Sequence, residues 1–415
     1  MKNKILATID VCREDIIAIG EDILRHPELG YKEFYTADVV KREFEKLGLD
    51  FRCELAVTGV KATVKIDDTP INVCVIGEMD AVKCYENPFA DKITGAAHAC
   101  GHNAQVATML GTAMGLLKSG ALAEMHGSIT FFAVPAEEFV ELEYRQMLKN
   151  EGKITYLSGK QELIALGEFA DVDIAMMVHS QASGAVPETY VGGTSLGFVA
   201  KQITIKGKPA HGSTPYDGIN ALNGAMLALM GINANRETFR DEDRVRIHPI
   251  ITNGGDLVNV VPERAVIETY VRASNPKAIE DACKKVDNAA KAGAMAVGAE
   301  CEIEDIPGYM PLIQDKTLTD IFVENAIPFV GAEQIKFGVD MTGSTDMGDL
   351  SLIVPSIQPT MGGFAGTAHG KDFLIADKEA AYIYPAKAMA CTVYDLLKDD
   401  AALAKKIKAE FIPKI

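Results

Sequence analysis

The stretch from Ala97 to Val106, AHACGHNAQV, places a thiol and several imidazoles within a few residues of one another. His98, Cys100 and His102 alternate along a segment that is predicted to be extended, so the side chains of Cys100 and His102 are expected on one face. A thiol beside an imidazole can bind a metal ion, serve a nucleophilic mechanism, or simply pack in a core. The stretch alone leaves all three interpretations open.

Acidic residues and further histidines follow apolar segments elsewhere in the chain. Asp80 ends VCVIGEMD, Glu137 and Glu138 end ITFFAVPAEE, His179 ends DVDIAMMVHS, and His369 lies in GGFAGTAHGKDF. Two adjacent carboxylates at the end of a strand are costly to bury unless a cation lies nearby. A thiol, three histidines and carboxylates together form a set suited to Zn²⁺, Mn²⁺, Co²⁺ or Ni²⁺.

The elements that must position these residues follow an α/β pattern. Apolar residues at helical spacing predict helices in DIIAIGEDILRHPEL and YTADVVKREFEKLG, and strands are predicted in KATVKI, NVCVIGEMD and SITFFAVPAEE. Strand, helix and strand then follow one another, which predicts a mixed, mostly parallel sheet. Polar residues just past such strands lie where α/β folds hold their chemistry.

The middle of the chain is organised differently. From about residue 197, strands and helices are predicted in the order βαββαβ, which is typical of a ferredoxin-like sandwich. We therefore expect a small domain inserted over residues 196–308. The flanking segments, 1–195 and 309–415, are expected to form the two parts of one larger α/β domain.

Composition excludes several classes of protein. The chain has 415 residues, 48% of them hydrophobic, and its 58 acidic and 41 basic residues give a net charge of −17. An acidic chain without a basic run is not expected to bind nucleic acid. No segment approaches the ~20 apolar residues of a membrane span, and the charged start is not typical of a signal peptide. The eight cysteines have no repeated spacing, which favours reduced thiols in a cytoplasmic protein.

A series of motifs along nearly the whole chain resembles a known family. They are RHPELGYKEFYTADVVKREFEKLG, GEMDAV, HACGHN, PAEE, the strand ending at His179, GSTDMGD and AHGKDF. Their order and spacing are similar to those of the aminoacylase-like di-metal amidohydrolases, which include hippurate hydrolases, plant indole-acetyl-amino-acid hydrolases and p-aminobenzoyl-glutamate hydrolase. GSTDMGDLSLIVPSIQP is most similar to the p-aminobenzoyl-glutamate hydrolase branch. The resemblance implies a zinc-exopeptidase-like catalytic domain with an inserted lid and dimerisation domain.

The same resemblance implies a function and a role for each candidate residue. It implies hydrolysis of the amide bond of an N-acyl amino acid or a small dipeptide-like substrate, with two divalent ions per subunit. Glu137 is expected to be the general base, and Asp80 is expected to support the site from behind. The expected metal ligands are Cys100, His102, Glu138, His179 and His369.

Three residues of the predicted lid complete the expected site. The resemblance implies that His211 reaches across a homodimer, formed through the lid domain, into the partner's active site as an oxyanion donor. Asn259 matches another polar residue of that region, and the Arg272 guanidinium is able to meet a substrate carboxylate bidentately. The alternatives are a surface loop histidine at His211 and an outward-facing strand residue at Arg272.

The chain departs from the commonest family pattern at three positions. Many members have Asp where this chain has Glu78 and Asn103, and His where it has Gln105, although Asn103 is also found in the p-aminobenzoyl-glutamate branch. The charged segment 139–169 is expected to be helical and to shape the pocket entrance. Two rival functions remain, namely a hydrolase with Cys100 as nucleophile and a non-catalytic metal-binding or scaffold protein.

Overall fold

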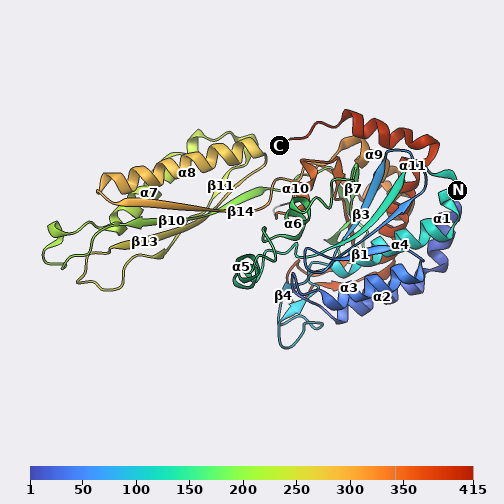
Figure 1. Ribbon diagram of the computed structural model, residues 1–415, viewed down its shortest axis with the longest axis horizontal. Helices are drawn as coiled ribbons and strands as arrows, with labels where there is room; N and C mark the ends of the chain where they lie inside the picture. Colours follow the sequence, from blue (N-terminus) through green and yellow to red (C-terminus); the bar gives the residue numbers. More distant parts are fainter. Residues whose placement is uncertain (342, 415) are drawn as a thin grey trace. The chain divides into compact units, whose positions relative to one another are not determined.

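The computed structural model describes residues 1–341 and 343–414, and the chain divides into two compact units (Figure 1). The first unit comprises Met1–Thr194, Ile313–Asp340 and Asp349–Ile415. The second comprises Ser195–Leu312 and Met341–Gly348. The second unit is therefore inserted into the first along the chain.

The first unit is built on a six-stranded sheet with the strand order β1-β2-β6-β3-β7-β16. The pairs β6–β3, β3–β7 and β7–β16 are parallel, whereas β1–β2 and β2–β6 are antiparallel. This mixed sheet with a parallel centre confirms the predicted α/β class. Its strands are β1 (Phe51–Leu55), β2 (Gly59–Lys65), β3 (Asn72–Glu78), β6 (Ser128–Val134), β7 (Ile174–Met176) and β16 (Ser356–Ile357).

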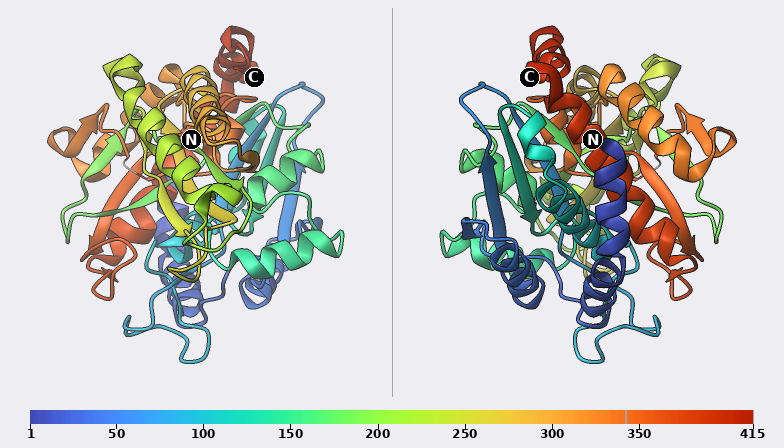
Figure 2. Two further views of the ribbon diagram at one scale, coloured as in Figure 1. Left: turned by 90° about the vertical axis from the view of Figure 1, so that its left-hand side faces the viewer. Right: turned by 90° about the vertical axis from the view of Figure 1, so that its right-hand side faces the viewer.

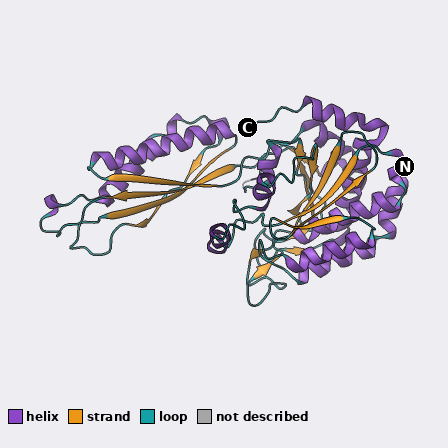
Figure 3. Ribbon diagram, in the orientation of Figure 1, coloured by secondary structure: helices purple, strands orange, loops and turns teal. Residues whose placement is uncertain are grey.

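The central strands are apolar throughout because both faces of the sheet are covered. Every residue of β3 is buried, and so is every residue of β6 after Ser128. The helix packed on β3 is α4 (His102–Lys118), which is buried from His102 to Leu116. A helix that is apolar on all sides needs a second cover. Helices α1, α2 and α11 supply it (Figure 3).

The remaining helices of the chain surround these elements. Figure 2 shows α1 beside the last helix, α11, which is interrupted by non-helical residues from Lys398 to Ala401. None of the helices in the described ranges combines the length and apolarity needed to cross a bilayer. Their bounds are α1 (Lys2–Val11), α2 (Arg13–Arg25), α3 (Phe34–Lys46), α5 (Leu142–Asn150), α6 (Gly159–Ala165), α9 (Lys316–Val330), α10 (Met347–Ser351) and α11 (Tyr384–Glu410).

A smaller sheet of the first unit has the order β15-β9-β17-β18, and β8 pairs in parallel with β17. Its strands are β8 (His179–Ala182), β9 (Thr189–Val191), β15 (Ile335–Phe337), β17 (Thr360–Ala365) and β18 (Leu374–Ile375). A separate hairpin joins β4 (Val82–Lys83) to β5 (Ala96–Ala97). Short 3₁₀ turns span Ala121–Glu124, Pro215–Asp217, Arg236–Thr238, Asp241–Asp243 and Ala332–Gln334, and a π turn spans Glu379–Ile383.

The second unit is an antiparallel sheet with two helices on one face (Figure 1). Its strand order is β11-β13-β10-β14, and β12 also pairs with β13. This arrangement confirms the predicted ferredoxin-like order, with the predicted strand RVRIHPIIT divided into β11 and β12. The elements are β10 (Gly197–Lys206), α7 (Ala221–Ala234), β11 (Arg246–Ile247), β12 (Ile250–Asn253), β13 (Arg264–Ala273), α8 (Pro276–Ala296) and β14 (Glu300–Pro307).

The two helices of this unit approach each other closely because small residues line their contact. A Cβ atom at Gly293 of α8 would lie 2.5 Å from the backbone nitrogen of Ala228 in α7, so only glycine fits there. Asn220 and Asn275 cap the two helices by accepting hydrogen bonds from the amides of Asn223 and Ala278. Most alanines of α8 are therefore buried inside the unit. Helix α7, in contrast, has exposed apolar side chains, namely Met226, Leu227 and Met230.

Candidate metal centre

The ends of the parallel strands bring the predicted acidic residues together. Strand β3 ends at Glu78, just before Asp80, and β6 ends at Val134, just before the pair Glu137 and Glu138. Because β3, β6 and β7 run in parallel, their carboxyl ends share one edge of the sheet. Glu78, Asp80, Glu137 and Glu138 are all buried at this edge.

Cys100 and His102 reach the same edge by a turn and not by an extended strand. Strand β5 ends at Ala97, residues 99 and 100 form a turn, and His102 is the first residue of α4. Gly101 between them has a φ of 79°, which is the left-handed region that glycine tolerates best. The expectation of an extended segment from His98 to His102 is therefore wrong. The chain must turn there to enter α4.

Backbone contacts fix the two remaining histidines. His179 begins β8, and its Nδ1 donates to the carbonyl of Ser180 at 3.1 Å, which leaves Nε2 facing Cys100 Sγ at 3.5 Å. The Ser180 hydroxyl donates to the Cys100 carbonyl at 2.7 Å. The amide of His369 donates to the Ala99 carbonyl at 2.8 Å. Both histidines are thus tied to the turn that carries Cys100.

Cys100 belongs to two groups of potential ligands. One group adds His102 and His179, the other adds Glu138 and His369, and the ligand atoms within each group lie within 4.8 Å of one another. Cys100 Sγ lies 3.4 Å from His369 Nε2, which in turn lies 3.3 Å from Glu138 Oε1. Ligand atoms about 2.0–2.3 Å from a shared ion lie roughly 3.0–3.6 Å apart at bond angles of about 90–109°. The separations within these groups are therefore those expected of side chains that would bind a divalent ion.

A third group contains Glu78, His102 and Glu137, again with ligand atoms within 4.8 Å of one another. Glu78 Oε2 lies 3.2 Å from His102 Nε2. The two carboxylates of the acidic pair therefore fall into different groups. Glu138 lies with Cys100 and His369, and Glu137 lies with Glu78 and His102.

Asp80 contacts both His102 and the backbone of Glu138. Its Oδ1 is 3.1 Å from His102 Nδ1, and its Oδ2 accepts a hydrogen bond from the Glu138 amide at 2.9 Å. A carboxylate on Nδ1 leaves His102 Nε2 to face the other ligands. Burial lowers the pKa of His102, but the charge of Glu78 and the bond to Asp80 outweigh burial and raise that pKa to about 9.

The buried atoms of the cluster fit a divalent cation. His102 Nε2 and Glu138 Oε1 are buried and have no hydrogen-bond partner in the described part of the chain. Burial raises the pKa of the Cys100 thiol well above its ordinary value, and the carboxylates of Glu138 and Glu137 raise it further. A metal ion at this place supplies the positive charge that thiolate and carboxylate ligands require.

Two residues hold the backbone that carries the acidic pair. Ala136, just before Glu137, has a φ of 54°, which is uncommon for a residue other than glycine. Its amide donates to Glu33 Oε1 at 2.8 Å, and its carbonyl accepts from Arg145 Nη1 at 3.3 Å. Arg145 Nη2 also donates to the Glu138 carbonyl. Glu33 and Arg145 are both completely buried.

The three lid residues lie in the second unit. His211 is exposed, and its neighbour Gly212 donates to the Asn259 carbonyl at 2.7 Å, so these two residues share one loop region. Arg272 lies on β13, where it donates to Ser344 Oγ at 3.1 Å and packs over the rings of Phe198 and Tyr270. Arg272 shares the face of β13 with the exposed residues Glu268 and Tyr270, as the alternative of an outward-facing strand residue expects, and these contacts leave its side chain half-buried.

Two buried cations beneath the carboxylates are not predicted by any pattern in the sequence. Lys160 of α6 pairs with Glu78 Oε1, and Gln105 Nε2 donates to Glu78 Oε2 at 2.8 Å. Arg145 of α5 is the other cation. Both come from the segment 139–169, which was expected to shape a pocket entrance and instead places these two side chains in the core. A sequence search of strand ends finds Glu78 but neither cation.

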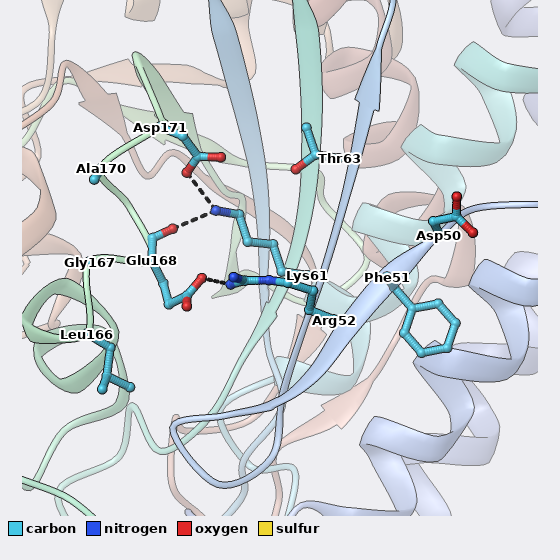
Figure 4. A pocket seen from close by; sticks show the side chains of 10 residues that line it. All are labelled: Asp50, Phe51, Arg52, Lys61, Thr63, Leu166, Gly167, Glu168, Ala170 and Asp171. Atoms are coloured by element: carbon cyan, nitrogen blue, oxygen red, sulfur yellow. Dashed lines mark hydrogen bonds and ion pairs between the residues drawn. The ribbon is translucent and has the colours of Figure 1, made fainter.

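A separate surface pocket carries no comparable chemistry (Figure 4). It lies between the strands β1 and β2 and the loop around Glu168. Its basic groups are already neutralised, because Lys61 Nζ lies 2.6 Å from Asp171 Oδ1 and Arg52 pairs with Glu168. The centre at the carboxyl edge of the sheet is therefore the candidate site.

Comparisons with known proteins agree with this geometry. Residues 195–296 match the family model described as a peptidase dimerisation domain of the M20 type. The chain is 29% identical to Xaa-Arg dipeptidase of Mus musculus, covering 100% of this chain and 93% of that protein. It is 26% identical to IAA-amino acid hydrolase ILR1-like 5 of Arabidopsis thaliana, covering 83% and 78%.

A solved structure has the same fold. It is the Bacillus subtilis YXEP protein, described as a dinuclear metal-binding peptidase from the M20 family. It superposes with a TM-score of 0.75 at 23% identity, covering 94% of this chain and 99% of that one. These matches confirm the resemblance carried by the motifs. Over nearly its whole length the chain is similar to members of the M20, or aminoacylase-like, family of metal-dependent amidohydrolases and peptidases.

Proposed function

We propose that this protein hydrolyses a linear amide bond in an N-acyl amino acid or a small dipeptide-like substrate. Relatives named as an Xaa-Arg dipeptidase and an IAA-amino acid hydrolase support cleavage next to an amino acid. Within this class we place the chain in the p-aminobenzoyl-glutamate hydrolase-like branch. The segment GSTDMGDLSLIVPSIQP and Asn103 support that placement.

The observation that carries the proposal is the position of Glu138 among the potential ligands around Cys100. Glu138 Oε1 lies 3.3 Å from His369 Nε2, in a group that includes Cys100, and we assign it to metal binding. Glu137 is the neighbouring carboxylate and lies near His102 and Glu78. The family resemblance supports its assignment to proton transfer.

The proposed ligands serve two divalent ions, and the donor set limits which ions these are. Thiolate, imidazole and carboxylate donors together suit zinc, manganese, cobalt or nickel better than magnesium or calcium. Cys100 is proposed as a metal ligand because its sulfur belongs to two of the groups of potential ligands. The full set is Cys100, His102, Glu138, His179 and His369.

Proton transfer by Glu137 completes the proposed reaction. Divalent ions supply Lewis acidity at this place, because they lower the pKa of water and polarise a carbonyl group. The Glu137 carboxylate takes a proton from the attacking water, whose oxygen forms a bond to the amide carbon. Glu137 then gives the proton to the leaving nitrogen as the C–N bond breaks. The products are a carboxylate and an amine.

His211 is proposed to donate a hydrogen bond to the developing oxyanion in the partner subunit. Its Nδ1 accepts from the Ser213 amide at 3.1 Å, and an accepting Nδ1 places the ring proton on Nε2. His211 therefore presents an N–H donor at the end of an exposed side chain. An oxyanion donor of this kind contributes roughly two to three orders of magnitude to turnover.

A homodimer through the lid domain is the assembly that this role requires. The match of residues 195–296 to a peptidase dimerisation domain supports it. The exposed apolar side chains of the unit support it as well, since Met226 and Met230 of α7 are 54% and 66% exposed and Ile250 of β12 is 51% exposed. Such side chains are able to form a closed two-fold contact.

Mixed dimers test the role of His211. A His211→Ala subunit and a Glu137→Gln subunit are each expected to be nearly inactive. When they exchange, the mixed dimer has one site with both residues intact, so activity should reappear. A verified mixed dimer without activity would mean that His211 serves its own subunit or has no catalytic role.

Asn259 and Arg272 are proposed to bind the substrate. The Arg272 guanidinium is held by Ser344 and by the rings of Phe198 and Tyr270, which leaves it oriented for a carboxylate. Such an anchor suits the free carboxylate of an N-acyl amino acid. Asn259 is proposed as a polar contact from the same lid.

The rival functions fit the site less well. A Cys100 nucleophile needs a lowered thiol pKa, whereas burial and the two nearby glutamates raise it. A scaffold protein has no use for an acidic pair divided between two ligand groups. All eight cysteines are free, which suits a reducing compartment, and we propose a cytoplasmic location.

Chelation and reloading test the proposed function. Metal-free protein reloaded with one metal at a time is assayed for release of an amine from N-acyl amino acids and dipeptides, including p-aminobenzoyl-glutamate. We expect no turnover without metal and recovery with at least one of zinc, manganese, cobalt or nickel. Turnover that survives complete removal of metal would refute the proposal and favour the cysteine hydrolase.

A further inference from the structure

We propose that Glu78 is a further ligand of the metal centre, and that Lys160 and Gln105 hold its carboxylate in position. The inference rests on the proposed di-metal function and adds one carboxylate to its ligands. Glu78 is the last residue of β3, Gln105 lies in the first turns of α4, and Lys160 lies in α6. All three side chains are buried.

The distance from Glu78 to His102 is that of two ligands of one ion. Asp80 occupies His102 Nδ1 at 3.1 Å, so Nε2 is the nitrogen left for a metal. Glu78 Oε2 lies 3.2 Å from that Nε2. Two ligand atoms about 2.1 Å from one ion are separated by roughly 3.0–3.4 Å at bond angles of about 90–109°. The measured separation falls within this range.

The contact between Glu78 and His102 is not a hydrogen bond, although the atoms are close enough for one. His102 Nε2 has no hydrogen-bond partner in the described part of the chain, although Glu78 Oε2 lies 3.2 Å from it. A ring that donates from Nδ1 to Asp80 has a lone pair on Nε2, and a lone pair and a carboxylate oxygen share no proton. A cation bound by both atoms accounts for their approach.

Lys160 and Gln105 fix the orientation of the carboxylate. Lys160 Nζ pairs with Oε1, and Gln105 Nε2 donates to Oε2 at 2.8 Å. The Glu78 amide donates to Gln105 Oε1 at 3.3 Å, which closes a ring of contacts between β3 and α4. Oε2 retains a second lone pair, since a carboxylate oxygen accepts two bonds. One of these two bonds goes to Gln105, so Oε2 keeps the capacity to bind a metal ion.

The rival explanation is that Glu78 serves only to neutralise the buried Lys160. A double variant separates the two explanations. Glu78→Gln with Lys160→Met removes both charges of the buried pair, so no uncompensated charge remains and the fold is expected to survive. Lys160→Met alone keeps the carboxylate. Comparing these two variants isolates what the Glu78 carboxylate contributes to metal binding.

The measurement is the affinity for Co²⁺ alone, determined by competition with a chelator of known affinity. A matched control is Lys2→Met with Asp395→Asn, which removes another acid–lysine pair between α1 and α11, outside the proposed ligands. Thermal unfolding of each metal-free variant verifies that it is folded. Neither readout depends on turnover.

We expect the double variant to bind one of its two Co²⁺ ions about 100-fold or more weakly than Lys160→Met does. This loss would exceed the ~10–100-fold that outer contacts of a ligand usually contribute. A smaller loss would overturn the assignment of Glu78. If the unaltered protein binds fewer than two Co²⁺ ions per chain, the proposed di-metal function itself fails. Two tight ions in both the unaltered protein and the double variant would refute only the role of Glu78.

Discussion

Replacing Arg145 with Met tests whether the acidic pair depends on the cation buried behind it. Arg145 is completely buried, and its guanidinium donates to the carbonyls of Ala136 at 3.3 Å and Leu157 at 2.6 Å. It also donates to the carbonyl of Glu138. Met fills a similar volume but donates no hydrogen bond. The variant therefore leaves two carbonyl groups beside the acidic pair, and the carbonyl of Leu157, without this donor.

The structure gives the scale of the expected loss. Hydrogen bonds from a charged donor contribute about 1.5–3 kcal/mol each, and the substitution also removes the cost of burying the guanidinium. We expect a net loss of about 3–5 kcal/mol in the free energy of unfolding, the usual effect of removing one partner from a buried ionic network. Burial raises the pKa of Asp80, whereas bonding to His102 and the charge of Arg145 lower it. Metal affinity should therefore fall as well, by roughly 10–100-fold.

Urea unfolding of the metal-free protein and Co²⁺ competition measure the two effects separately. Arg42→Met is the matched control, because the Arg42 side chain is 51% exposed and lies on helix α3. The control should change stability by no more than about 0.5 kcal/mol. If Arg145→Met retains Co²⁺ affinity within about threefold of the unaltered protein, the acidic pair does not depend on Arg145 and the reasoning is refuted.

Three further substitutions probe other parts of the site. Glu138→Gln should weaken one of the two ions by about 100-fold or more, and elemental analysis showing two ions after dialysis would argue against its role as a ligand. Asp80→Asn should lower Co²⁺ affinity by roughly 10–100-fold through the orientation of His102, so an unchanged affinity would contradict the contact assigned to it. Burial and the charge of Asp80 raise the pKa of Glu33 from 4.5 to about 8, so the metal-free protein should lose stability as pH rises through that interval. The loss should reach up to about 1.4 kcal/mol per pH unit, and Glu33→Gln should flatten it, whereas equal slopes would refute the shift.

Much of the site could be predicted from the sequence because its acidic residues and His179 follow buried strands. The apolar composition of β3 and β6 predicts that they are buried strands. Parallel strands bring their carboxyl ends to one edge of the sheet. Asp80, Glu137 and Glu138 therefore converge as expected. The ferredoxin-like unit was equally predictable, because its strands and helices alternate in periodicity and its two long helices begin at Asn caps.

The turn before helix α4 and the buried cations of the site depend on tertiary contacts, which the periodicity of the sequence does not reveal. Cys100 and His102 meet through a turn at Gly101, which a pattern of alternating residues cannot distinguish from a strand. Lys160 and Arg145 lie in a charged segment that resembles a solvated helix. Lys160 is buried because it pairs with the Glu78 carboxylate, which is distant in sequence. Arg145 is buried because it donates to backbone carbonyls such as that of Glu138.

Turnover of metal-loaded Glu137→Gln shows whether Glu137 transfers protons at a centre of two metal ions. Glutamine keeps the size of the side chain but cannot accept the proton. We expect the variant to retain two ions per chain while its turnover falls by about two to four orders of magnitude. If the variant retains both ions and hydrolyses its substrate within about tenfold of the unaltered rate, Glu137 is not the general base.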